Sequence, residues 1–152
     1  MATVQSAKFD NLTPSQRSAC MAAIKGSDTR PEMIVRRLVH SLGYRYRLHR
    51  RELPGTPDLV LARYQCIVFV HGCFWHMHRC RRGMSTPRTN AEFWKTKRQR
   101  TRIRDRRNVG LLRRAGWRVL VVWECQTLGQ VNLAKRLNAF IKGEKRAAKL
   151  GL

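Results

Sequence analysis

Two short apolar segments on either side of a long arginine-rich helix limit the folds open to this chain more than any other feature. Residues 66–70 and 117–123 are rich in β-branched side chains, which is typical of strands buried in a sheet. Between them, residues 91–114 have the length and apolar spacing of a helix that ends at Gly116. Because this helix has to cross over between buried strands, we predict a central mixed β-sheet flanked by helices, in the α/β (α+β) class.

The remaining segments add strands and helices to this sheet. Residues 59–62 and 66–70 are separated by a short connection, which predicts a hairpin buried on both faces with catalytic residues at its ends. Residues 44–48 alternate apolar and basic side chains, which predicts a strand with one polar face. Helices are predicted after the cap signals at Thr13 and Thr29, up to Gly26 and Gly43, and from amphipathic spacing over residues 130–142.

The chain length fits one domain. A chain of 152 residues is long enough to bury a hydrophobic core, and we find no internal repeat or linker. We therefore expect a single domain over residues 1–152, with about 1–12 as a flexible N-terminal arm and 143–152 as a flexible tail.

The charge balance points to a polyanionic partner. Thirty-two Lys and Arg against nine Asp and Glu give a net charge of +23. Nucleic acid fits this surplus better than a membrane surface, because each neutralised phosphate releases condensed counterions. A charge run is usually a solvated face, but residues 95–114 carry many Lys and Arg and only one acid, Asp105, so we predict that part of this helix contacts phosphates.

The membrane and export classes are not favoured by the sequence. No apolar run approaches the length of a membrane span, and residues 1–11 lack the apolar region of a signal peptide. We expect a cytoplasmic, DNA-associated protein. In that reducing compartment the five cysteines favour metal binding or burial over disulfides, and we expect Cys20 and Cys66 to be core residues.

The other three cysteines form a metal-ligand pattern with a histidine. Cys73, His78 and Cys80 lie in one short segment, and Cys125 follows the last strand. Three thiolates and one imidazole predict a closed, structural zinc site that pins a loop to the end of that strand. Two alternatives stay open: Cys73 and Cys125 could simply be buried, and His76 could replace His78 as the ligand.

A possible catalytic carboxylate lies at the start of a buried strand. The segment PDLV at residues 57–60 would hold Asp58 on a rigid element, where it could bind a hard cation that prefers oxygen ligands. By itself this short motif is a weak signal, and Asp58 could equally cap a turn after Pro57.

A set of longer motifs is far more specific. The chain reads VHGCFWHMHRC at residues 70–80, TNAEFW at 89–94 and WRVLVVWEC at 117–125. These segments closely resemble very short patch repair (Vsr) DNA mismatch endonucleases, and the resemblance runs from about Ser18 to Phe140. It implies a fold related to type II restriction endonucleases, and a magnesium-dependent enzyme that nicks double-stranded DNA beside the T of a T·G mismatch left by deamination of 5-methylcytosine.

The resemblance also implies roles for individual residues. Asp58 and the backbone carbonyl of Val70 would bind magnesium, although a threonine occurs at the position of Val70 in a well-known family member. Glu32 and His71 would organise metal-bound water, and His76 would be the catalytic acid or base, a task that suits an imidazole. The residues expected to push into the base stack beside the mismatch are Phe74, Trp75 and Trp94.

Several of these residues have a structural interpretation as well. Glu32 has the position of a capping-box partner of Thr29, and His71 or His76 could orient zinc ligands. Trp94 could belong to the core.

Three functions follow from these observations. The first is a mismatch-specific nicking endonuclease that acts as a monomer and works with other mismatch-repair proteins. The second is a zinc-stabilised nucleic-acid-binding protein without catalysis, and the third is a restriction-type endonuclease that cuts perfect duplex. The joint presence of Asp58, His71 and His76 favours an enzyme, and the aromatic residues beside them favour a mismatch substrate.

Overall fold

The computed structural model describes residues 12–24 and 26–143. The flexible arm and tail predicted at the two ends fall outside the described residues, apart from Leu12 and Gly143. Within the described part of the chain, no helix combines the length and apolar character that crossing a membrane requires.

A four-stranded sheet forms the centre of the molecule, with strands in the order β1-β2-β3-β4. The strands span Arg47–Leu48, Leu59–Leu61, Cys66–His71 and Arg118–Trp123. β1, β2 and β3 pair antiparallel, whereas β3 and β4 pair parallel, with His71 opposite Trp123. The parallel pair is joined by the long helix, so the predicted mixed sheet and its crossover are confirmed.

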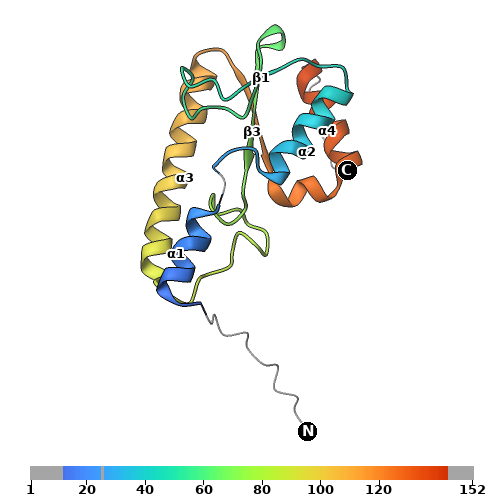
Figure 1. The fold of residues 1–152 in the computed structure, drawn as a ribbon. Helices are drawn as coiled ribbons and strands as arrows, with labels where there is room; N and C mark the ends of the chain where they lie inside the picture. Colours follow the sequence, from blue (N-terminus) through green and yellow to red (C-terminus); the bar gives the residue numbers. More distant parts are fainter. Residues whose placement is uncertain (1–11, 25, 144–152) are drawn as a thin grey trace, which may run out of the picture.

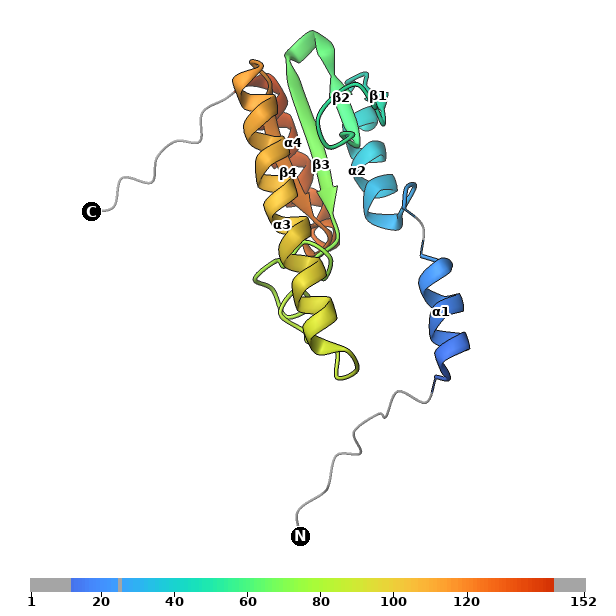
Figure 2. The same cartoon turned by 90° about the vertical axis from the view of Figure 1, so that its left-hand side faces the viewer.

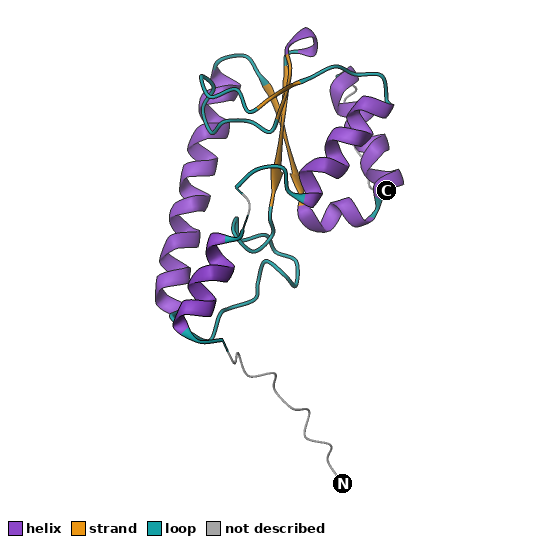
Figure 3. Cartoon of the chain, in the orientation of Figure 1, coloured by secondary structure: helices purple, strands orange, loops and turns teal. Residues whose placement is uncertain are grey.

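Helices cover both faces of this sheet (Figure 1). α2 (Arg30–Ser41) and α4 (Gln130–Lys142) lie on one face, and α3 (Ala91–Arg114) lies on the other. The bounds of α3 and α4 match the predicted ranges. Two short 3₁₀ helices, η1 (Ala62–Tyr64) and η2 (Glu124–Leu128), follow β2 and β4, and most of the connection between β3 and α3 has no regular secondary structure (Figure 3).

The core has one apolar cluster on each face of the sheet. The larger cluster packs α2 and α4 against the sheet, and the smaller packs α3 against the opposite face. Alternate residues of one strand therefore enter different clusters, as the prediction of a hairpin buried on both faces requires. The fully buried members include Val35, Val39, Leu59, Leu61, Val68, Val122 and Leu137 in the larger cluster, and Ile67 and Leu112 in the smaller one.

The first helix lies apart from this core. α1 (Pro14–Ala22) begins at Thr13 with the predicted capping box to Gln16, but none of its residues is buried. Figure 2 shows α1 beyond the N-terminal end of α2, away from the sheet. The prediction that Cys20 is a core residue is therefore wrong: Cys20 is exposed because its helix packs no side chain into the core, whereas Cys66 is buried in β3 as expected.

The first strand is shorter than its alternating pattern predicts. Only Arg47 and Leu48 pair with β2. The two tyrosines before them bond to helices instead: the hydroxyl of Tyr44 donates to Asn138 Oδ1 at 2.6 Å, and that of Tyr46 to the carbonyl of Arg36 at 3.3 Å. These contacts draw the segment toward α2 and α4 before it reaches the sheet edge.

Candidate active site and metal centre

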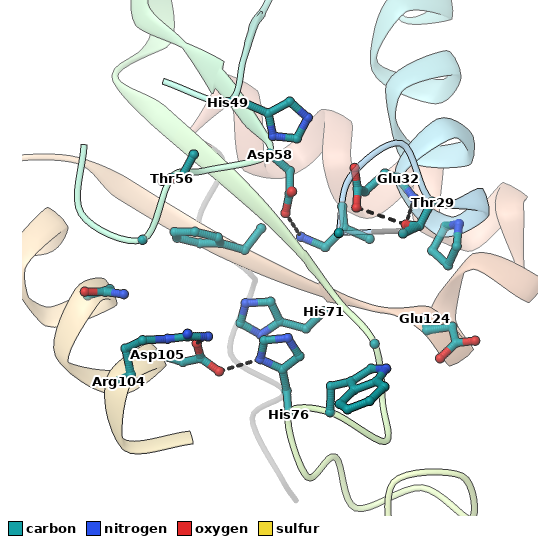
Figure 4. A pocket seen from close by; sticks show the side chains of 18 of the residues that line it. Thr29, Glu32, His49, Thr56, Asp58, His71, His76, Arg104, Asp105 and Glu124 are labelled. Atoms are coloured by element: carbon teal, nitrogen blue, oxygen red, sulfur yellow. Dashed lines mark hydrogen bonds and ion pairs between the residues drawn. The ribbon is translucent and has the colours of Figure 1, made fainter. Parts of the chain in front are cut away.

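A pocket of about 920 Å³ lies where β2 begins and β3 ends. Elements from both sides of the sheet contribute to it: the start of α2 on one side and the middle of α3 on the other (Figure 4). All four predicted catalytic side chains line this pocket, together with acidic, imidazole and basic groups that the sequence did not single out. The titratable lining residues are Glu32, His49, Asp58, His71, His76, Lys97, Arg104, Asp105 and Glu124.

Asp58 is fixed by the hairpin. It directly precedes β2, and its Oδ2 accepts the backbone N–H of Val70 in β3 at 2.6 Å. Burial raises the pKa of Asp58 to about 6; the Val70 N–H opposes this, nearby Glu32 adds to it, and His49 and Arg36 oppose it. A half-buried carboxyl with so elevated a pKa would gain from a bound cation, since a cation favours its ionised form.

Two stacked imidazoles lie across the pocket from Glu32. The rings of His71 and His76 are 3.9 Å apart between centroids and 7° from parallel. Burial lowers the pKa of His71 to about 4, and the neighbouring His76 acts in the same direction. His71 is therefore neutral near pH 7.

His76 is oriented by Asp105, a residue that the sequence did not identify. Nδ1 of His76 bonds to the Asp105 carboxylate, which leaves Nε2 for other partners. Burial raises the pKa of Asp105, but the hydrogen bond from His76 and the positive charges of His76, His71 and Arg104 together outweigh burial, so the net pKa is lowered. A carboxylate behind an imidazole fixes its orientation and stabilises its protonated form. The only available signal was that Asp105 is the single acid among the bases of residues 95–114.

Glu32 is held tightly by its own helix terminus. Its Oε1 accepts the Thr29 hydroxyl at 3.0 Å, and its Oε2 accepts the Asp28 N–H at 2.9 Å and Arg36 Nη2 at 3.2 Å. The predicted partnership with Thr29 is thus present, and Glu32 also lines the pocket. Its structural and functional interpretations are compatible, because these bonds fix the carboxylate at the pocket wall.

The four predicted zinc ligands come together. The ligand atoms of Cys73, His78, Cys80 and Cys125 all lie within 4.8 Å of one another. Cys125 Sγ is 3.5 Å from His78 Nδ1, and the Cys125 N–H donates to Cys73 Sγ at 3.4 Å. Such spacings suit ligands that share one tetrahedral ion at bond lengths of about 2.0–2.3 Å. His78 belongs to this set, whereas the alternative ligand His76 faces Asp105.

Polar contacts tie the segment between β3 and α3, residues 72–90, to its surroundings; we call this segment the metal loop. Arg98 of α3 is buried and donates to the carbonyls of Phe74 at 2.6 Å, Ser85 at 3.0 Å and Gly83. At the other side, Glu124 accepts the Cys73 N–H at 3.3 Å. Arg98 therefore supports the metal loop, and it is one base of α3 that is not available to DNA.

The three aromatic residues expected to enter DNA form one cluster next to the pocket. Phe74, Trp75 and Trp94 contact one another edge to face, with ring centroids 5.2–6.1 Å apart. All three are partly buried, and Phe93 beside them is 58% exposed. The cluster is neither fully buried nor fully exposed. Trp94 is therefore not a core residue, which was its alternative interpretation.

Most bases of α3 face solvent. Lys97 and Arg104 line the pocket, and the Lys97 ammonium lies 5.4 Å from the centre of the Trp94 ring. A basic helix beside a pocket of carboxylates and imidazoles is suited to a polyanionic substrate whose backbone is cleaved. The exposed bases of this helix are Lys95, Lys97, Arg100, Arg104, Arg106, Arg107, Arg113 and Arg114.

The chemistry of this pocket suits a nuclease, and comparison with known proteins identifies the class and the kind. The family described as DNA mismatch endonuclease Vsr matches residues 9–82. The DNA mismatch endonuclease Vsr of Escherichia coli is 40% identical over 88% of this chain and 88% of its own length. The chain belongs to the Vsr family of DNA endonucleases.

Other relatives carry the name of nicking enzymes. The type II nicking enzyme V.XorIIP of Xanthomonas oryzae is 48% identical over 77% of this chain and 85% of its own length. The type II nicking enzyme V.NmeAIP of Neisseria meningitidis is 38% identical over 91% of this chain and 98% of its own length. The protein is therefore a DNA-nicking endonuclease, as the first of the three sequence-based functions requires.

Proposed function

We propose that this protein nicks double-stranded DNA beside the T of a T·G mismatch by magnesium-dependent phosphodiester hydrolysis, and so initiates very short patch repair. The observation that supports this most is the position of the aromatic cluster of Phe74, Trp75 and Trp94 directly beside the pocket that holds Asp58, His71 and His76. Wedging apart a base step costs a few kcal/mol, and a mispair lowers that cost, so an aromatic wedge next to the cleavage groups selects mismatched DNA.

In this proposal the pocket residues divide the work of hydrolysis. Asp58 and the carbonyl of Val70 hold magnesium, which when bound would neutralise charge at the phosphate and help to activate water. Glu32 and the neutral His71 orient the attacking water by hydrogen bonds. His76 transfers a proton through Nε2, and Asp105 on Nδ1 keeps the ring oriented and stabilises its charged form.

The cluster of Cys73, His78, Cys80 and Cys125 has a structural role in this proposal. Three thiolates and one imidazole form a closed zinc site with no open position for substrate. Its effect on activity is indirect, since His76 and the aromatic residues Phe74 and Trp75 belong to the loop that the ion would hold. We further propose that the chain acts as a single-domain monomer on bacterial DNA, recruited by other mismatch-repair proteins.

The proposal is tested by strand-specific nicking of a duplex with one T·G mismatch and of its fully paired counterpart, with magnesium and then with chelator. We expect magnesium-dependent cutting of the T strand in the mismatched duplex alone. Equal cutting of the paired duplex would overturn the mismatch assignment in favour of a restriction-type reaction.

An Asp58→Ala variant tests the cation site in the same assay. Loss of a cation ligand removes several kcal/mol of charge stabilisation, so we expect nicking to fall by about 10³-fold or more while binding to the mismatched duplex persists. Glu52→Ala is the matched control, because Glu52 is an exposed carboxylate that does not line the pocket. Nicking by Asp58→Ala at the rate of this control would remove Asp58 from the mechanism.

A further inference from the structure

A buried arginine stands behind the pocket wall formed by Glu32 and His49. Arg36 lies one turn after Glu32 on α2 and is only 6% exposed. Its guanidinium contacts Asp28 Oδ1 at 2.6 Å, Glu32 Oε2 at 3.2 Å and His49 Nε2 at 2.9 Å. Arg36 does not line the pocket, but two of its three partners do.

His49 is brought to the cleavage site by strand register. β1 and β2 pair antiparallel with Leu48 opposite Leu59, so the next residues, His49 and Asp58, face each other where the pair ends. Figure 4 shows the His49 ring next to Asp58, on the same side of the pocket. The backbone of His49 has φ 42°, in the left-handed region. A non-glycine residue held there is destabilised by roughly 1 kcal/mol or more, and such residues gather at functional sites.

The contact with Arg36 decides which nitrogen of His49 carries the proton. A guanidinium has only donors and stays charged, so the nitrogen that it meets must be an acceptor. Nε2 of His49 is that nitrogen, and the ring proton is therefore on Nδ1. Among the described residues, no hydrogen bond is made by Nδ1. His49 thus places an imidazole ring with an unused N–H donor in the pocket, with its tautomer fixed from behind.

The buried charge of this arrangement indicates what it is for. Glu32 and Arg36 form a buried ion pair, with 5% and 6% exposure. Such pairs contribute little net stability, and apolar replacements of similar volume are often neutral. Stability alone therefore gives little reason for a buried guanidinium at this position. Holding the two polar pocket residues Glu32 and His49 in place does give a reason.

We propose that His49 is a further substrate-binding residue, which donates its Nδ1–H to a non-bridging oxygen of the phosphate that is cut, and that Arg36 is the residue that positions it. This inference rests on the proposed cleavage site at Asp58. A donor fixed in advance stabilises the charge that develops on the phosphate without reorganising during the reaction. Lys97 and Arg104 reach the pocket from α3, so His49 supplies a donor from the opposite side.

The tautomer is measured first, on the whole protein without DNA. Long-range ¹⁵N–¹H spectra of the histidine side chains distinguish the two neutral tautomers, and the His49 signals are those absent from His49→Gln. We expect the Nδ1–H form in the unaltered protein and a mixture of tautomers in Arg36→Met. Arg37→Met is the control and should leave the tautomer unchanged, because the Arg37 side chain is exposed on the same helix. An Nε2–H form in the unaltered protein would overturn the role of Arg36.

The phosphate contact is then tested in the same spectra by adding a short duplex without magnesium. The His49 Nδ1–H signal should shift, whereas the signals of the exposed His40 should not. This measurement needs DNA binding but no cleavage, so it decides the inference even if mismatch-specific nicking fails. An unshifted His49 signal at saturating duplex would overturn the contact.

Nicking kinetics complete the test. Under single-turnover conditions we expect His49→Phe to cut about tenfold to a hundredfold more slowly, with duplex affinity nearly unchanged, because one charge-assisted donor is lost in the transition state. His49→Gln should recover most of the rate, since its amide can accept from Arg36 and still donate. His40→Phe is the matched control. Equal rates for His49→Phe and the control, or no recovery in His49→Gln, would show that His49 is structural.

Discussion

The two sides of the pocket are held in place by different forces. The sheet with α2 and α4 encloses a continuous apolar cluster of fully buried side chains. The metal loop, residues 72–90, buries only Cys73 and Gly83 and is fixed by the cysteine and histidine cluster, by Arg98 and by Glu124. The first side is stabilised by many interchangeable contacts, and the second by a few specific ones.

This difference divides the proposed catalytic residues. Asp58 and His71 belong to strand ends that the apolar cluster supports, whereas His76 belongs to the metal loop. The stack of His71 on His76 joins the two sides. The pocket is therefore complete only when both sides are folded, and each side can be perturbed separately.

The largest expected effect comes from breaking the metal loop with Cys125→Ser. Structural zinc contributes on the order of 10 kcal/mol to small metal-dependent folds, so losing one ligand should release the ion and unfold the loop. We expect less than one zinc per chain by atomic absorption and a loss of nicking of more than about a hundredfold, while circular dichroism retains the helix signal. Cys20→Ser, at an exposed cysteine outside the cluster, should keep both zinc and activity. A fully loaded Cys125→Ser protein would contradict the ligand set.

The next effect comes from the apolar side, with Leu137→Ala in α4. Leu137 is fully buried, and truncations of this kind cost about 2–5 kcal/mol through lost burial and a cavity. Urea unfolding should show this loss, while zinc content and nicking at 25 °C stay unchanged. Val131→Ala, on the same helix but 71% exposed, should change stability by less than about 0.5 kcal/mol. Zinc loss in Leu137→Ala would show that the two sides do not respond separately.

The smallest effect concerns His71, where the two sides meet. Its pKa is lowered to about 4, so between pH 6.5 and 4 the unfolded chain binds a proton that the folded chain does not. Stability from this group is thus present above pH 6.5 and lost as the pH falls toward 4, by about 2 kcal/mol at pH 4.5. In His71→Gln this part of the pH dependence should disappear. The free energies of unfolding of the two proteins would be measured by urea unfolding from pH 7 to 4.5. If they changed equally with pH, the lowered pKa would be contradicted.

The sequence predicted features that depend on local signals. Threonine and proline at the start of α1 and α2 marked these helices, because caps act within one turn, and apolar spacing marked α3 and α4. The spacing of Cys73, His78 and Cys80 marked the metal cluster for a similar reason, since three of its ligands lie close together in the chain. Strand β1 was overestimated because the bonds of Tyr44 and Tyr46 to the helices depend on tertiary structure.

The partners of the catalytic residues were harder to predict. Asp105 reaches His76 across 29 positions, and Arg36 reaches His49 across 13. Neither spacing has a periodic signature, and Asp105 and Arg36 each occur in helices where a charged residue is ordinary. The roles assigned to Asp58, His71 and His76 came from the resemblance to a family, and the structure adds which residues stand behind them.

The parallel pairing of β3 and β4 has a consequence for how the chain folds. His71 pairs with Trp123, and the proposed metal ligands Cys73 and Cys125 each follow two positions later. A slip of one residue would displace one thiol by about 3.3 Å and turn its strand to the opposite face. The ligand set therefore closes only on the correct register of two strands that lie far apart in the sequence. Zinc capture would thus act as a proofreading step in folding, retaining chains whose slowest, least local pairing has formed without error.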